Sequence, residues 1–292
     1  MVDSKTQRIA LFNALEPGSH FWCNEISEFG ISAVYEAIIN EIYDPEKFEK
    51  IITRVRDFKV HEWQERLEET DAVFLDPDCD AWPDSLNHLA NPPIGLIVKG
   101  NVKSLKAPSL AIVGTRNPTP YGIRIAGDFA AGFVDREWAI VSGGAYGIDA
   151  AAHRGALVAE GCTIAVIASG IDSPYPSGNA KLFSEIVENG AIVSEVSMGV
   201  PALPHRFLTR NRLIAALSKS TLVVEAAFRS GSLRTARDAA ELMKPVMAIP
   251  GPINSPSSEG CHRLIGERSA ELVTSVADAC ELLSVINETI PM

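Results

Sequence analysis

From Leu110 onward the chain alternates short apolar runs with helical stretches, and this alternation constrains the fold more than any other feature. Six runs rich in Val, Ile and Ala are expected strands, and a seventh is a weaker candidate: 110–115, 139–144, 163–169, 191–196, 221–226, 245–250 and, less regular, 271–275. Helical stretches separate the early runs, at 122–135, 148–160 and 179–188. Strand–helix repeats of about 25–30 residues with almost continuously apolar strands predict a doubly wound, mostly parallel α/β sheet.

The first 72 residues show a different pattern, in which apolar residues recur at helical spacing. This segment holds 15 acids and 8 Lys/Arg, a net charge of −7. We therefore expect a small all-helical module over 1–72, which either solvates itself or docks a partner protein. Two short apolar runs, 72–75 and 95–99, lead into the main domain, which we place at 73–286, followed by a tail at 287–292.

Three of the expected strands end in residues that suit phosphate binding. Glycine lets a backbone approach an oxyanion closely, hydroxyl groups add donors, and arginine adds charge. The carboxyl ends of parallel strands meet at one edge of a sheet, where helix N-termini also point. The residues concerned are Thr115 and Arg116 after the first strand, Gly143, Gly144 and Tyr146 after the second, and Ser230, Gly231, Ser232 and Thr235 after a later one.

A basic stretch accompanies these strand ends. From His205 to Arg237 there are seven Lys/Arg and one acid, Glu225, a local balance of +6 in a chain whose formal net charge is −11. Its centre is the cluster Arg210, Asn211 and Arg212, at the head of an apolar helical run. Such a reversal of charge predicts a surface that meets an anion.

Several kinds of catalytic site are not indicated. The patterns GxxxxGK[ST], GxGxxG, HExxH and GxSxG are absent, and the five cysteines lie far apart without a CxxC pair, as in a reduced cytosolic protein. Asp149 and His153 fit a helix-capping acid and a packed histidine, and Glu225 fits an ion pair with Arg210 or Arg212 better than a general base. We predict binding rather than turnover, with no catalytic residue, metal or cofactor.

The chain resembles the DNA-processing protein A family (DprA, also called Smf), which has an extended Rossmann-like fold of the SLOG superfamily. The resemblance covers about residues 72 to 284, and the helical N-terminus is similar to the SAM-like module of that family. Six motifs carry it, in the family's order: GTRNPTPYG, SGGAYGIDAAAHRGAL, SGIDSPYPSGN, RFLTRNRLIAALS, VVEAAFRSGSLRTA and AIPGPINSPSSEGCHRLI.

The resemblance implies a cytoplasmic, non-enzymatic protein that binds single-stranded DNA without sequence preference. It also implies protection of incoming strands, loading of the RecA recombinase during natural transformation, and a homodimer, with no membrane contact. By position, Arg116 becomes a DNA-phosphate contact, and Gly143, Gly144, the 210–212 cluster and the 230–232 loop line the same pocket. On this view, Ala at Arg210 and Arg212 weakens DNA binding, and an acid at Gly144 faces the incoming phosphate without unfolding the chain.

Some residues depart from the family's pattern. Thr115 stands where serine is usual, and Tyr146 stands where arginine is usual, so that one charge is replaced by a ring able to stack on a base. From the end of the sequence at Met292 we expect no winged-helix domain of the kind that many relatives have. The alternative function is that of a SLOG-type nucleotide-binding enzyme, a nucleoside monophosphate phosphoribohydrolase, or of a nucleotide sensor.

Overall fold

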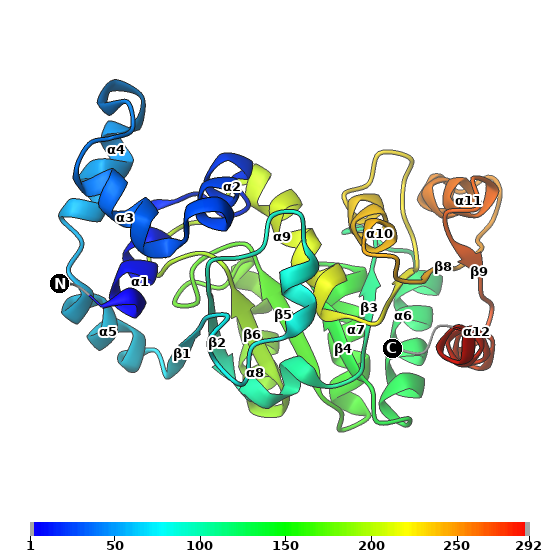
Figure 1. The fold of residues 1–292 in the computed structure, drawn as a ribbon. Coiled ribbons are helices and arrows are strands. Elements are labelled where there is room, and N and C mark those ends of the chain that lie inside the picture. Colours follow the sequence, from blue (N-terminus) through cyan, green and yellow to red (C-terminus); the bar gives the residue numbers. More distant parts are fainter. Residues whose placement is uncertain (1–2, 290–292) are drawn as a thin grey trace.

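One nine-stranded sheet contains every run that the sequence predicts to be a strand. In the computed structural model, which describes the backbone of residues 3–289 and the side chains of residues 3–284, the strand order is β1-β2-β6-β5-β4-β3-β7-β8-β9 (Figure 1). The pairs β1–β2 and β2–β6 are antiparallel, and all other neighbours are parallel. The strands are β1 Ala72–Leu75, β2 Leu96–Gly100, β3 Ser109–Val113, β4 Ala139–Ser142, β5 Thr163–Ile167, β6 Ala191–Ser194, β7 Ser220–Val223, β8 Val246–Ala248 and β9 Glu271–Leu272. The predicted doubly wound, mostly parallel α/β sheet is confirmed.

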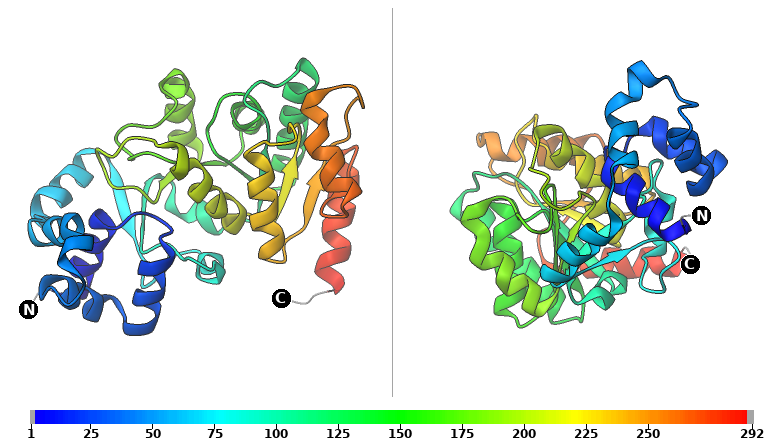
Figure 2. Two further views of the ribbon diagram at one scale, coloured as in Figure 1. Left: turned by 90° about the horizontal axis from the view of Figure 1, so that it is seen from above. Right: turned by 90° about the vertical axis from the view of Figure 1, so that its left-hand side faces the viewer.

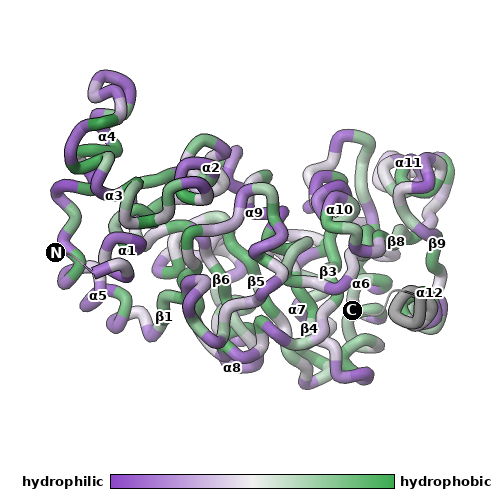
Figure 3. Tube along the Cα trace, viewed as in Figure 1, coloured by the Kyte–Doolittle hydropathy of each residue, from purple (hydrophilic) through white to green (hydrophobic). Residues whose placement is uncertain are grey.

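Helices cover both faces of the sheet because alternate residues of each buried strand point to opposite sides. In β3, Leu110 and Ile112 pack in a core with α6 and α7, whereas Ala111 and Val113 pack in a second core with α9 and α10. Figure 3 shows the apolar residues gathered on the strands. The helices after β3 are α6 Pro120–Val134, α7 Ile148–Val158, α8 Ala180–Asn189, α9 Pro204–Leu217, α10 Ser232–Glu241, α11 Glu259–Gly266 and α12 Val276–Thr289.

Five helices precede the sheet and lie beside its β1–β2 end (Figures 1 and 2). The first and fifth of them pack on β1 through aromatic contacts, because the ring of Phe74 meets Phe12 at 5.1 Å and Trp63 at 5.6 Å between centroids. The helices are α1 Ser4–Ala14, α2 His20–Phe29, α3 Ile31–Ile39, α4 Pro45–Arg56 and α5 Val60–Glu69. All five lie within the predicted helical module 1–72. Its independence from 73–286 stays a prediction.

The predicted tail at 287–292 starts inside a helix. Helix α12 continues to Thr289, so residues 287–289 belong to it, and residues 290–292 lie outside the described part of the chain. Helix α6 begins at Pro120, two residues before the helical stretch expected from the sequence. Thr119 accepts a hydrogen bond from the Gly122 amide at 3.2 Å, and Pro120 occupies the first turn.

Helix α9 joins the helical segment to the sheet through buried and half-buried charges. Near the middle of α9, the Arg212 guanidinium donates to both carboxylate oxygens of Glu195, which follows β6, at 2.6 and 2.8 Å. Nearer its start, Arg206 donates to both oxygens of Glu16, in the loop after α1, at 2.6 and 2.8 Å. The position of α9 therefore depends on pairs formed with two distant segments.

Arg212→Ala is expected to lower the free energy of unfolding by about 3–5 kcal/mol, because it leaves the Glu195 carboxylate buried without a cation. The double variant Arg212→Met with Glu195→Leu removes both charges, so its free energy of unfolding should fall less than that of Arg212→Ala. Urea unfolding followed by circular dichroism measures both. A loss below about 1 kcal/mol for Arg212→Ala, the size usual for a surface pair, would contradict a buried pair.

Candidate nucleic-acid interface

The carboxyl ends of β3, β4 and β7 form one edge of the sheet, as the sequence predicts. The Thr115 amide, after β3, donates to the Glu225 carbonyl after β7 at 2.7 Å. The Ile148 amide, which opens α7, donates to the Thr115 carbonyl at 3.1 Å. Gly147, at φ +84°, is held so close to the Thr115 carbonyl that no side chain fits there. These bonds fix the loops after three strands relative to one another.

The outer part of this edge carries an aromatic and cationic cluster that we call the Arg116 cluster: exposed Arg116 and Tyr175 and half-buried Phe207, with exposed Tyr146 beside it. The Arg116 guanidinium lies over the Phe207 ring at 4.8 Å, and the Phe207 and Tyr175 rings meet edge to face at 5.8 Å. Tyr146 and Tyr175 are both about half exposed, at 48% and 49%. The Tyr146 hydroxyl packs on Gly178, in the loop that also carries Tyr175.

The two glycines after β4 do not offer an open anion site, contrary to the expectation from the sequence. The amides of Gly143 and Ala145 donate to the Asp149 carboxylate at 3.1 and 3.4 Å, so an internal acid occupies the position expected for a phosphate. Gly144, at φ +67°, faces the core, where an added Cβ would lie 2.6 Å from the Phe183 ring. An acid at Gly144 would therefore disturb packing rather than face a ligand.

Arg210 lies beneath these glycines and supports them. Its guanidinium donates to the Gly143 carbonyl at 2.7 Å and to the Val166 carbonyl, and the residue is 6% exposed. Burial lowers the pKa of Arg210 to about 10, and burial raises the pKa of Asp149 against the opposing effect of Arg210. These donors point into the fold, and the predicted role of Arg210 as a DNA contact stays a prediction.

Arg212 and Glu225 also differ from expectation. Arg212 pairs with Glu195 rather than lining the strand ends, and it is 9% exposed. Glu225 pairs with neither Arg210 nor Arg212. Its carboxylate accepts hydrogen bonds from the Thr119 amide and hydroxyl at 2.9 and 2.6 Å.

The loop before α10 reaches the same edge. Asn211 donates from its amide side chain to the Gly231 carbonyl at 3.1 Å, which joins this loop to α9. The hydroxyl groups of Ser230 and Ser232 lie 2.7 Å apart. Gly231 is exposed and Ser230 is half-buried, whereas Ser232 and Thr235 are buried. Ser230 and Gly231 thus remain available at the surface, and Ser232 and Thr235 do not.

The local charge of +6 overstates the free positive charge of the basic stretch. Acids from outside the counted segment pair with three of its seven cations: Arg206 with Glu16, Arg212 with Glu195, and Arg234 with Asp238. Spacing along the chain cannot reveal such partners when they come from distant segments. The stack of the Arg116 guanidinium on the Phe207 ring, by contrast, was not predicted from the sequence.

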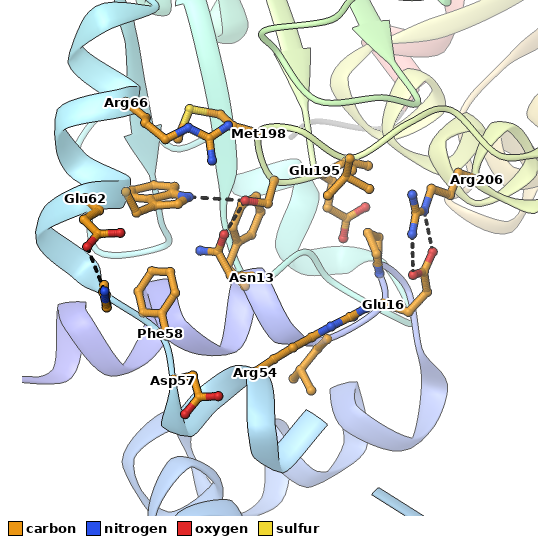
Figure 4. Close-up of a pocket in the computed structure, with 18 residues that line it drawn as sticks. Asn13, Glu16, Arg54, Asp57, Phe58, Glu62, Arg66, Glu195, Met198 and Arg206 are labelled. Atoms are coloured by element: carbon orange, nitrogen blue, oxygen red, sulfur yellow. Dashed lines mark hydrogen bonds and ion pairs between the residues drawn. The ribbon is translucent and has the colours of Figure 1, made fainter. Parts of the chain in front are cut away.

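A cavity of about 570 Å³ lies between the helical segment and the loop after β6. Figure 4 shows Phe58, Arg54 and Glu62 on one side of it, with Glu195 and Arg206 on the other. Its charged lining residues are equal in number, namely the cations Arg54, Lys59, Arg66 and Arg206 and the acids Glu16, Asp57, Glu62 and Glu195. This balance gives the cavity no excess charge for an anion.

Neither a metal site nor a membrane span is evident in the described chain. Among residues 3–284, no group of three or more His, Cys, Asp or Glu side chains is placed to hold a metal ion. Within the same described part, no helix has the length and apolar character needed to cross a bilayer.

The sequence and the fold both match known proteins. The sequence profile described as DNA recombination-mediator protein A matches residues 74–284. The chain is 51% identical over 178 residues to a putative DNA processing protein DprA of Mycobacterium tuberculosis, which covers 61% of this chain and 46% of the relative. It is 43% identical over 201 residues to the DNA processing protein DprA of Streptococcus pneumoniae, which covers 69% of this chain and 70% of the relative. The matched part is thus about half the length of the mycobacterial relative.

Two solved structures are similar to this fold. The X-ray structure of DNA processing protein A from Streptococcus pneumoniae superposes with a TM-score of 0.82 and 32% identity, over 96% of this chain and 98% of that one. The structure of DNA processing protein A from Helicobacter pylori, described for its single-stranded DNA binding mode, gives a TM-score of 0.67 and 33% identity, over 73% and 95%.

The pH dependence of stability tests the packed state of His153, which lies in α7 under the edge. Its Nδ1 and the Thr163 hydroxyl are 2.7 Å apart, and burial lowers the pKa of His153 from 6.5 to about 3. As the pH falls from about 6.5 toward 3, the unfolded chain takes up a proton on His153 before the folded protein does. The His153 contribution to the free energy of unfolding therefore falls by up to about 1.4 kcal/mol per pH unit.

His153→Gln should consequently show a shallower loss of stability than the unmodified protein between about pH 6 and pH 4 in urea titrations, because it carries no titrating group. The variant is expected to be less stable at neutral pH, so the slope is the informative quantity. Parallel curves for the two proteins would contradict the lowered pKa, because they would show that His153 takes up its proton equally in the folded and unfolded states.

Proposed function

This chain belongs to the DNA recombination-mediator protein A family, and we propose on that premise that it binds single-stranded DNA without sequence preference at the Arg116 cluster. The observation that carries this proposal is the stack of exposed Arg116 on half-buried Phe207, with exposed Tyr175 against it. Aromatic rings give sequence-tolerant stacking for unpaired bases, and a guanidinium adds charge for the backbone. The single-stranded DNA binding mode described for the Helicobacter relative supports the same class of ligand here.

The contact residues predicted from the sequence divide into two groups in this proposal. Arg116, Tyr146, Ser230 and Gly231 reach the surface and are proposed to touch the strand, together with Thr115, which is half-buried beside Arg116. The buried members are proposed to shape the edge from within: Gly143, Gly144, Arg210, Asn211, Arg212, Ser232 and Thr235. Duplex DNA should bind less well, because its bases are already stacked and cannot reach the rings.

We extend the proposal to the wider role that family membership suggests. The protein would coat incoming single strands in the cytoplasm, act as a homodimer, and help load the RecA recombinase. No bond in DNA would be made or broken. A nucleoside monophosphate hydrolase is less well supported, because the one acid at this edge after β7, Glu225, is 4% exposed and already accepts hydrogen bonds from Thr119. Release of free base from adenosine monophosphate would reverse that judgement.

Arg116→Ala is expected to weaken binding of an oligothymidylate and to reduce the slope of log affinity against log salt by about 0.7, the value for one phosphate contact on a single strand. Fluorescence anisotropy at several salt concentrations measures both quantities. Arg136→Ala is the matched control, since Arg136 is exposed at the far end of α6, where it donates to the Gly132 carbonyl. Equal slopes for the two variants would remove Arg116 from the site.

Recombinase loading has its own test. On single-stranded DNA already covered by a single-strand-binding protein, RecA should begin hydrolysing ATP sooner when this protein is present, because the proposed role is to nucleate RecA filaments. Arg116→Ala should shorten the lag less than the unmodified protein. An unchanged lag with the unmodified protein, under conditions where DNA binding is saturated, would contradict the loading role and leave DNA binding standing.

A further inference from the structure

A second exposed ring with a stacked guanidinium lies outside the Arg116 cluster. Phe228, in the loop between β7 and α10, is 51% exposed, and the Arg263 guanidinium of α11 lies over its ring at 4.8 Å. Arg263 is also held by Glu267, one turn later, at 2.7 Å, and its side chain is 37% exposed. About half of the Phe228 surface is thus exposed to water, and its ring is already paired with a cation. The Arg116 cluster does not include this pair.

This pair rests on the same edge of the sheet as the Arg116 cluster. Strands β3 and β7 are parallel neighbours, so the loops that follow them are adjacent. The Thr115 amide bonds the Glu225 carbonyl, three residues before Phe228, and Asn211 bonds the Gly231 carbonyl, three residues after it. Both rings are therefore attached to one hydrogen-bonded framework, with the Ser230–Gly231 turn lying on the chain between Phe228 and α10.

The surroundings of Phe228 are cationic. Arg229 is exposed directly beside it, and Arg237 of α10 is exposed and lines a hollow of about 80 Å³ together with Arg263. Figure 1 shows α10 and α11 as neighbours on this face. Two acids lie nearby: Glu259 in the first turn of α11, and Glu267 directly after α11, which lines the same hollow and pairs with Arg263.

We propose that Phe228 with Arg263 is a second base-stacking site for the strand held at the Arg116 cluster, with Arg229 and Arg237 beside its phosphates. This inference rests on the proposed function. The ligand is a further nucleotide of the same single strand, recognised by its π-face and its charge and not by its base edge. The DNA strand then runs along the edge of the sheet, from the end of β5 and the start of α9 toward α10 and α11. A short oligomer reaches only one of the two sites.

The experiment compares affinities for oligothymidylates from about 4 to about 16 nucleotides, the range of site sizes of single-strand-binding modules. Phe228→Leu keeps an apolar side chain and removes the ring. It should leave the affinity for the shortest oligomers unchanged and lower that for the longest by roughly 5- to 100-fold, the size of one stacked base. Phe228→Trp should restore it. Phe29→Leu is the matched control, because Phe29 is an exposed ring of similar accessibility, 56%, at the end of α2.

Each outcome decides between the two proposals. Loss confined to long oligomers, with rescue by Trp, supports the second site. Unchanged affinity at every length for Phe228→Leu, while Arg116→Ala still weakens binding, overturns the second site and leaves the first in place. An equal loss at every length overturns it too, because Phe228 would then belong to the first site. Absence of any binding by the unmodified protein would overturn the proposed function itself.

Discussion

The buried guanidinium of Arg210 is the interaction on which the proposed interface depends. It donates to the carbonyls of Gly143, after β4, and Val166, within β5, and so joins α9 to two neighbouring strands. Phe207 lies three residues earlier on the same helix, about one turn away, so fixing Arg210 also fixes the ring that stacks on Arg116. The sequence predicts Arg210 as a ligand contact, and we propose instead that it holds the contact residues in place.

Features set by neighbouring residues were predictable from the sequence, whereas features set by distant partners were not. The strand runs and the helical stretches between them are local patterns, and the structure shows each close to where the residues indicate it. The edge location of Arg116 followed from topology alone. The roles of Arg210 and Arg212 did not, because their partners, the Val166 carbonyl and the Glu195 carboxylate, lie 44 and 17 residues away in sequence. Of the aromatic residues, only Tyr146 was expected from the sequence; Phe207 and Tyr175 were missed, since they meet only after folding.

Charge on this edge is modest once the internal pairs are counted. An acidic chain with few free arginines at its binding edge is poorly suited to grip DNA by charge alone. Exposed rings compensate, because stacking energy does not depend on salt in the way that phosphate contacts do. We therefore regard the interface as a set of rings fixed by buried arginines, with a small number of exposed arginines beside them. In this proposal the buried arginines hold the rings in place, and the exposed arginines contact the phosphates.

Ultraviolet cross-linking to an oligothymidylate, followed by mass spectrometry of the digested protein, tests this account most directly. The account predicts adducts on the rings of the Arg116 cluster, foremost Phe207 and Tyr175, which meet at 5.8 Å on the sheet edge. Adducts confined to the aromatic residues of the helical segment, such as Phe21 and Phe48, whose rings stack at 5.5 Å, would contradict it.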